Sequence, residues 1–216
     1  SLDTLDRAKF HQMTRRDELN NVLDGICAAQ EVGFDPVKIN AVIERGINDS
    51  ELLDLATFGR EQNVEVRFIE FMPLDAEGHW MNDKVVGQAE ILEKISSKYP
   101  LEVLPARGAA PADRFRFLDG GLYGEGSPGS MIGVIPTITK PFCGDCDRVR
   151  LTAEGDFRTC LFANKEFDLL TALRSGESDD QVADRIEAAV ATKWAGHQIH
   201  QVNFTRPAKS MSQLGG

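Results

Sequence analysis

Polar and apolar residues alternate along two short stretches in the first third of the chain. In residues 37–41, Lys38 and Asn40 fall on one side of an extended strand, and the apolar neighbours fall on the other. Glu65 and Arg67 alternate with apolar residues in the same way. A period of two residues is typical of β-strands, whose successive side chains point to opposite faces. We therefore expect strands within residues 34–43 and 64–72.

Each predicted strand follows a predicted helix. The first helix covers residues 17 to about 32, and the second begins at a cap of Asn48, Asp49 and Ser50 and runs to about residue 62. Helices and strands that alternate along the chain indicate parallel strands covered by helices, as in a barrel or a doubly wound sheet.

In a helix-covered barrel the side of each strand that faces the helices must be apolar, so the polar residues of these strands should point into the lumen. A lysine or arginine buried there needs a partner or an anionic ligand. Lys38 is thus a candidate ligand-binding residue. The alternative is an internal salt bridge that involves Glu65 and Arg67.

The organisation changes near residue 75. Short strands rich in turn residues follow, and they predict a separate, mostly antiparallel unit; two helices within 166–176 and 178–194 close the chain, the second with Ser178 as its cap. We expect two domains, at 1–75 and 76–216.

The composition excludes several classes of protein. The chain has 216 residues, of which 42% are hydrophobic and 27% charged, so it is globular with one large domain or two small ones. No apolar run approaches the roughly 20 residues that span a membrane. A formal charge of −10 argues against general binding of nucleic acid, because affinity for phosphate backbones comes from clustered lysine and arginine. Any anionic ligand must be held by local charges.

Three cysteines form the most specific chemical motif. Cys143, Cys146 and Cys160 have the spacing C-x2-C-x13-C, with Gly144 in the turn between the first two. Paired thiols at this spacing predict a metal site. A histidine could supply a fourth ligand, or one metal position is left open for a small molecule. Cys27, in the first predicted helix, is expected to be a core cysteine, since free cysteine is often buried.

Two other interpretations of the cysteines stay open. One is a disulfide or a set of buried thiols. The other is a zinc-stabilised binding module in which His197 or His200 is the fourth ligand. Few cysteines and reduced thiols both favour a reducing compartment, so the expected location is the cytoplasm.

Two arginines alternate around Val149 directly after the second cysteine. Arg148 and Arg150 would bind phosphate or carboxylate through paired donors beside the metal. The alternative is a solvated edge strand, where charges deter aggregation.

The chain resembles the C-terminal two thirds of a known family, molybdenum cofactor biosynthesis protein A, the GTP 3',8-cyclases. The segments that carry the resemblance are SLDTLD, DPVKINAVIERGIND, VEVRFIEFMPLD, PFCGDCDRVRLTAEGDFRTCLF and the terminal Gly215-Gly216. The resemblance implies a radical S-adenosylmethionine enzyme, a lyase that converts GTP to (8S)-3',8-cyclo-7,8-dihydroguanosine 5'-triphosphate. Its product would pass to the next enzyme of molybdopterin synthesis.

The resemblance also implies roles for single residues. Cys143, Cys146 and Cys160 would hold a [4Fe-4S] cluster whose open iron binds the purine of GTP. The expected contacts with GTP come from Lys38, Arg148, Val149 and Arg150, and those with S-adenosylmethionine from Ser1 and Met72. The double glycine would be the family's tail that reaches toward the active site.

The implied fold is α/β: the C-terminal half of an incomplete (βα)6 barrel, followed by a mixed, mostly antiparallel α+β extension that carries the metal site. The family's N-terminal C-x3-C-x2-C motif, which carries the cluster that cleaves S-adenosylmethionine, is absent, since no cysteine precedes Cys27. The chain is therefore expected to be a fragment that is inactive alone. A partner chain, as in a homodimer, or a rearranged terminus would cover its exposed barrel edge.

Overall fold

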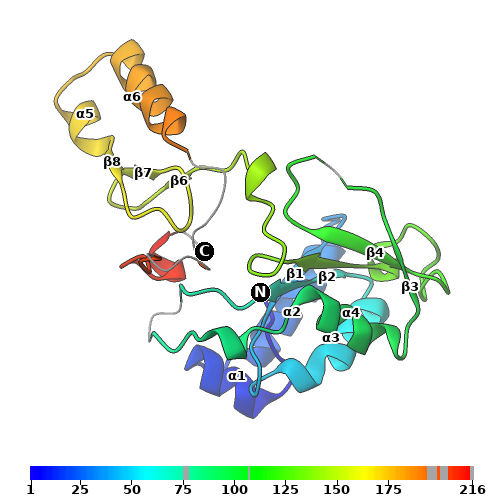
Figure 1. The fold of residues 1–216 in the computed structure, drawn as a ribbon. Helices are drawn as coiled ribbons and strands as arrows, with labels where there is room; N and C mark the ends of the chain where they lie inside the picture. Colours follow the sequence, from blue (N-terminus) through cyan, green and yellow to red (C-terminus); the bar gives the residue numbers. More distant parts are fainter. Residues whose placement is uncertain (75–77, 107, 194–198, 200–203, 215–216) are drawn as a thin grey trace. The chain divides into compact units, whose positions relative to one another are not determined.

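A computed structural model of the chain describes residues 1–74, 78–106, 108–193, 199 and 204–214. These residues form two compact units, drawn in Figure 1. The first comprises residues 1–71 and 81–140, and the second comprises residues 72–80 and 141–216. The predicted domain boundary between residues 75 and 76 lies outside the described residues, and the division into 1–75 and 76–216 stays a prediction.

The first unit is built on a mixed sheet of five strands in the order β1-β2-β5-β4-β3. Its strands are β1 (Lys38–Ile43), β2 (Glu65–Glu70), β3 (Leu101–Val103), β4 (Asp113–Phe117) and β5 (Met131–Ile135). β1, β2 and β5 run parallel, while β3 and β4 extend the sheet in antiparallel fashion. The fold is thus mixed α/β and the sheet is open.

Four helices supply apolar side chains to one core with this sheet: α1 (Arg7–Thr14), α2 (Leu19–Glu31), α3 (Leu52–Glu61) and α4 (Gln88–Ser96). Strand alternation explains the arrangement, because Ile39 and Ala41 of β1 are buried whereas Lys38 and Asn40 are exposed. Short 3-10 turns, η1 (Asp49–Glu51), η2 (Asn82–Lys84) and η3 (Pro128–Ser130), connect the elements. The sheet therefore has a helix-packed face and a polar face.

The pairing of β5 differs from the prediction. Residues 101–135 do not form a sheet apart from the first two strands, because β5 pairs in parallel with β2. The apolar run from Met131 to Ile135, in which four of the five residues are buried, fits this position in the middle of the sheet. The helix start predicted at Asn48, Asp49 and Ser50 is confirmed, because Asn48 is the N-cap of η1, which leads directly into α3, but the Asn48 side chain forms no capping hydrogen bond. The Asn48 side chain is buried and instead bonds the carbonyls of Asp3 and Val42.

The second unit has a small antiparallel sheet of β6 (Arg150–Leu151), β7 (Asp156–Arg158) and β8 (Phe167–Asp168). Two helices, α5 (Leu170–Arg174) and α6 (Asp179–Ala191), and two 3-10 turns, η4 (Cys143–Asp145) and η5 (Met211–Leu214), complete the described elements. The predicted cap of the last helix is confirmed, since Ser178 and Gln181 form a reciprocal capping box. The buried apolar cluster of the second unit consists of Phe157, Leu169 and Ala189.

Candidate functional site

Residues 143–160, here called the cysteine segment, occupy a turn and a hairpin of the second unit. Cys143 begins the 3-10 turn η4, and the Cys146 N–H lies 3.4 Å from the Cys143 carbonyl oxygen. Cys160 follows β7, which pairs with the strand after Cys146. All three thiols are half-buried, and no disulfide joins any of the chain's four cysteines. The disulfide interpretation is therefore wrong.

Cys27 lies elsewhere, in α2 of the first unit. Its side chain is exposed, which contradicts the prediction of a core cysteine. The helix packs in the first unit's core through Leu19 and its partly buried apolar neighbours, and Cys27 lies at the exposed edge of that stripe. It thus belongs to a different unit from the other three cysteines.

Arg148 gives Cys146 an electropositive environment. Its Nε and one terminal nitrogen each lie 3.4 Å from the Cys146 Sγ, and its guanidinium stacks 4.4 Å above the centroid of the Phe142 ring. Burial opposes ionisation of the Cys146 thiol. Hydrogen bonds from the Arg148 backbone and side chain and the charges of Arg148 and Lys193 outweigh it, so the pKa of Cys146 is lowered. A thiol in such surroundings favours the thiolate, the form that binds metals.

Arg150 lies in β6, where it pairs in register with Arg158 of β7, two residues before Cys160. Burial lowers the pKa of Arg150, and repulsion from Arg148 acts in the same direction, whereas the thiols of Cys160 and Cys146 act against it. One nitrogen of Arg150 donates to the Leu214 carbonyl at 3.3 Å. Among the described residues, neither arginine forms a salt bridge with a carboxylate.

Val149 lies between these arginines with 45% of its surface exposed. An exposed apolar side chain flanked by two guanidinium groups suits a ligand that has both a flat ring and anionic groups. The sequence alternative of a solvated edge strand also fits the exposure of Arg148 and Val149.

The donor set of the cysteine segment fits a metal or an iron-sulfur cluster by its chemistry. Three thiols outside disulfides, one with a lowered pKa, are the ligands that such a cluster needs. Over the part of the chain that the structure describes, however, no group of three or more histidine, cysteine or acidic side chains is arranged to hold a metal ion. The two histidines proposed for a zinc site, His197 and His200, lie outside the described residues, as do Gly215 and Gly216.

The polar face of the first unit carries Lys38, as the alternation predicts. Lys38 pairs in register with Glu65 across β1 and β2, and Arg67 donates through Nε to the Glu65 carboxylate at 2.9 Å. The predicted salt bridge between Glu65 and Arg67 is confirmed. Lys38 is exposed and forms no ion pair with any described residue. Its ammonium is available to an anionic ligand.

Met72 is half-buried and follows the end of β2, two residues after Glu70. The Glu70 side chain is fully buried, and no cation is paired with it among the described residues. Its oxygens accept backbone N–H bonds from Gln88 at 2.9 Å and from Ile138 and Thr139 at 2.7 Å each, and the Thr139 hydroxyl donates as well. Gln88 begins α4, so the carboxylate also lies at a helix N-terminus, which favours negative charge.

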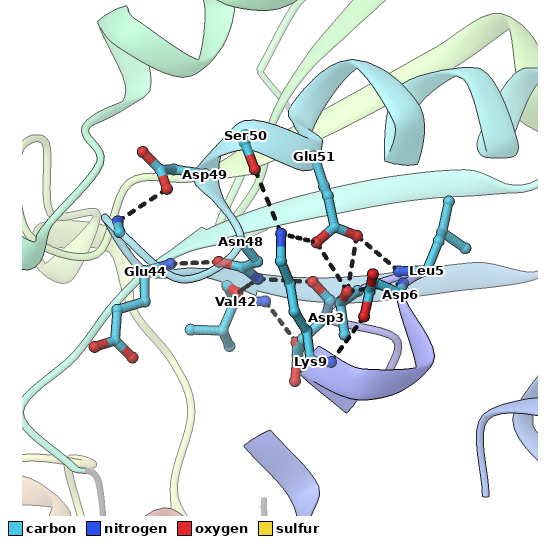
Figure 2. Close-up of polar contacts among 12 residues, drawn as sticks. Asp3, Leu5, Asp6, Lys9, Val42, Glu44, Asn48, Asp49, Ser50 and Glu51 are labelled. Carbon is cyan, nitrogen blue, oxygen red and sulfur yellow. Dashed lines mark hydrogen bonds and ion pairs between the residues drawn. The ribbon is translucent and has the colours of Figure 1, made fainter. Parts of the chain in front are cut away.

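Ser1 lies beside β1, since the N–H of the next residue, Leu2, donates to the Asn40 carbonyl at 2.9 Å. Figure 2 shows the polar network that fixes this N-terminal segment. The Asp3 carboxylate accepts from the Val42 N–H at 2.8 Å, and Glu51 accepts from the hydroxyl of Thr4. The segment that carries Ser1 is therefore held on the strand that carries Lys38.

Sequence reasoning missed three groups of residues that position these candidates. They are Glu70, the network around Asn48 and Glu51, and Arg114 on the polar face. Glu70 could have been found, because it continues the apolar face of Val66 and Phe68 and is thus a charge on the buried side of its strand.

Comparisons with known proteins cover the whole chain. The profile of a family described as Molybdenum Cofactor Synthesis C matches residues 64–199. The chain is 44% identical to a GTP 3',8-cyclase of Paenarthrobacter nicotinovorans, 43% to one of Streptomyces coelicolor and 42% to one of Rhodopirellula baltica. Each match spans 100% of this chain and 63%, 62% and 59% of the relative, respectively. The chain thus spans about three fifths of the length of these relatives.

Proposed function

Because the chain belongs to the molybdenum cofactor synthesis family, whose profile matches residues 64–199, we propose that it is the GTP-binding part of a GTP 3',8-cyclase. The observation that carries the proposal is the pairing of the cysteine segment with Arg148 and Arg150, two guanidinium groups without carboxylate partners among the described residues. The relatives named above carry the same activity in their names. The alternative of a zinc-stabilised binding module has no support from these comparisons.

In this proposal Cys143, Cys146 and Cys160 hold a [4Fe-4S] cluster with one iron open. When bound, the cluster supplies a Lewis-acidic iron for the purine of GTP. The part of this chain is positioning: Arg148 and Arg150 hold the triphosphate through charge-assisted hydrogen bonds, and Val149 offers an apolar contact. Holding the ribose and base in a near-attack arrangement lowers the barrier to cyclisation.

Three further residues have ligand-binding roles in this proposal. Lys38, exposed and without an ion pair among the described residues, contacts the phosphates of GTP. Ser1 and Met72 contact S-adenosylmethionine, the source of the radical in a lyase of this class. The incomplete (βα)6 barrel is the fold we propose for the complete enzyme, in which β1, β2 and β5 would be adjacent parallel strands.

The relation to the other partners is also a proposal. The complete enzyme would hold a second [4Fe-4S] cluster and pass its product to the next enzyme of molybdopterin synthesis, and it would act in the cytoplasm. Among the described residues, no helix is long and apolar enough to cross a membrane. Whether two chains associate as a homodimer is tested by sedimentation equilibrium of the purified protein.

The cysteine assignment is tested by iron and sulfide analysis after anaerobic reconstitution. Alanine at Cys143, Cys146 or Cys160 should each abolish incorporation of iron, whereas Cys27→Ala, which changes an exposed thiol of the first unit, should leave it intact. Stoichiometric zinc in place of iron, or full iron content in the Cys160→Ala variant, would contradict the three-thiolate assignment.

The anion-binding assignment is tested by GTP affinity at one salt concentration. Alanine at Arg148 or Arg150 should weaken binding by about 1.5–3 kcal/mol, the usual range for a charged hydrogen bond. Arg185→Ala is the matched control, because both of its hydrogen bonds go to Glu177 and its side chain is half exposed. Equal affinity in the wild type and in the Arg148/Arg150 double variant would show that the phosphates bind elsewhere.

A further inference from the structure

A cavity of about 520 Å³ lies in the first unit, where β1, β2 and β5 begin. Its lining includes Asp35, Lys38, Asn63, Glu65, Arg114 and Ser127. Two of these residues are cationic and two are acidic. Asp35 is exposed, whereas Glu65 is 1% exposed, so the acid that faces the cations at depth is Glu65.

Glu65 of β2 is shared between two arginines, Arg67 of the same strand and Arg114 of β4, which lies on the far side of β5. Arg67 donates to one carboxylate oxygen at 2.9 Å, which is a hydrogen bond. The Nε of Arg114 lies 3.8 Å from the other oxygen, which is close enough for charge attraction but too far for a hydrogen bond. One buried carboxylate is thus already neutralised by Arg67, and the charge of Arg114 is in excess.

The nitrogen donors of Arg114 have few strong hydrogen-bond acceptors among the described residues. Its Nε is buried and has no hydrogen-bond partner, and one terminal nitrogen faces the Met131 sulfur at 2.8 Å, a weak acceptor. A buried donor without a partner costs about 1–3 kcal/mol. Arg114 lines the cavity and has a donor without a partner, so an acceptor group of a ligand that enters the cavity would remove this cost.

Gly133 of β5 makes room for this arrangement. It lies between Arg67 and Arg114 in the strand register. A Cβ at Gly133 would come within 3.0 Å of the Arg67 Cγ and 3.6 Å of a Glu65 oxygen. The absence of a side chain at Gly133 of β5 therefore leaves room for the Arg67 side chain, which bonds to Glu65. The remaining open space adjoins Arg114 and Lys38.

We propose that Arg114 is a further phosphate-binding residue of the substrate site, acting beside Lys38 on the polar face of the sheet. This inference rests on the proposed function, since it takes the ligand to be a nucleoside triphosphate. Lys38 and Arg114, both without a hydrogen-bonded carboxylate among the described residues, offer an ammonium and a planar guanidinium to the phosphate oxygens. Glu65 is a positioning residue that holds Arg67 and orients Arg114 by charge.

The chain provides a matched control two residues along the same strand. Arg116 points to the same side of β4 as Arg114, but its guanidinium is paired with Glu102 and Glu125. Exposed ion pairs of this kind contribute little to stability. Removing Arg116 therefore alters net charge and packing as removing Arg114 does, without removing an available donor.

The experiment compares GTP, inorganic tripolyphosphate and guanosine as ligands of the reconstituted full chain at one ionic strength. Arg114→Ala should weaken GTP and tripolyphosphate by about 10-fold to 100-fold, as expected for a charged hydrogen bond. Guanosine affinity should stay within about twofold, and Arg116→Ala should shift none of the three beyond about twofold. Arg114→Lys, which keeps the charge, should recover part of the loss and guards against a folding defect in the alanine variant.

The possible failures are distinguishable. If Lys38→Ala weakens GTP binding and Arg114→Ala does not, the inference is overturned and the proposed function stands. If Arg114→Ala weakens guanosine and GTP equally, its role is structural and the inference is again overturned. If the wild-type chain binds neither GTP nor tripolyphosphate, the proposed function fails and takes the inference with it.

Discussion

The carboxylate of Glu70 provides a stringent test of how the first unit is held together. It is fully buried without a paired cation among the described residues, and it accepts three backbone N–H bonds and one hydroxyl bond. Both chain segments that leave the first unit after residues 71 and 140 begin within two residues of these contacts. The first of these segments begins with Met72, and the second leads to the cysteine segment.

The expected magnitude follows from the donors that lose their acceptor. Glu70→Ala removes the carboxylate acceptor of the Gln88, Ile138 and Thr139 N–H groups, and each lost bond costs about 1–3 kcal/mol. Water entering the space left by the side chain recovers part of this cost. A net loss of about 3–5 kcal/mol is expected, as for other broken buried charge networks. Glu70→Gln should lose less, about 1–3 kcal/mol, because one acceptor oxygen is kept.

Hydrogen exchange measured by mass spectrometry is the suitable assay, because an optical signal mixes the two units. Peptides from β2 and β5 report the stability of the first unit alone. Glu90→Ala is the control, since Glu90 pairs with Arg45 at the surface, with 48% and 42% of the side chains exposed, and should cost under about 1 kcal/mol. A Glu70→Ala variant as stable as the Glu90→Ala control would refute the reasoning.

Three further predictions concern stability and activity. Burial opposes ionisation of Glu51, but hydrogen bonds from Lys9, Thr4 and the Leu5 N–H lower its pKa below the usual 4.5. The stabilising effect of the Glu51 carboxylate is therefore present above pH 4.5 and is lost as the pH falls through the lowered pKa. The urea midpoints of the wild type and of Glu51→Gln should converge as the pH falls through that range. Gly59→Ala places a Cβ 2.7 Å from a Val66 methyl and should cost about 1–3 kcal/mol in thermal unfolding, whereas Gly25→Ala, with open space, should be neutral or stabilising. The 216-residue polypeptide alone should release no 5'-deoxyadenosine from S-adenosylmethionine, because Cys27 is its only cysteine outside the trio; release at an enzyme-like rate, measured by chromatography, would disprove this.

Local periodicity predicted much of the fold of the first unit. The strands expected within 34–43 and 64–72 are β1 and β2, and the first predicted helix is α2. These elements were predictable because burial on one face imposes a period of two or 3.6 residues. The position of β5 was not predicted, since its partner lies some 65 residues earlier in the chain and pairing over that distance leaves no local pattern. Helices α1 and α4 were missed as well; α4 is only nine residues long.

The candidate site was predictable to the extent that chemistry is local in sequence. The spacing of Cys143, Cys146 and Cys160 and the alternation of Arg148 and Arg150 lie within a single stretch of 18 residues. Arg114 was not predictable, because its significance depends on Glu65 and Met131, which belong to other strands. The exposure of Cys27 was missed because residue type alone does not tell which side of a helix packs on the sheet.

The central claim is that the cysteine segment holds a cluster that contacts the base of GTP. The most direct measurement is electron-nuclear double resonance of the reduced, reconstituted chain with GTP labelled with nitrogen-15 in the purine. The account predicts a nitrogen coupling to the cluster that appears with GTP, is absent with tripolyphosphate and disappears in the Cys143→Ala variant. Tight binding of GTP without any nitrogen coupling would contradict the account, because the base would then lie away from the three thiolates.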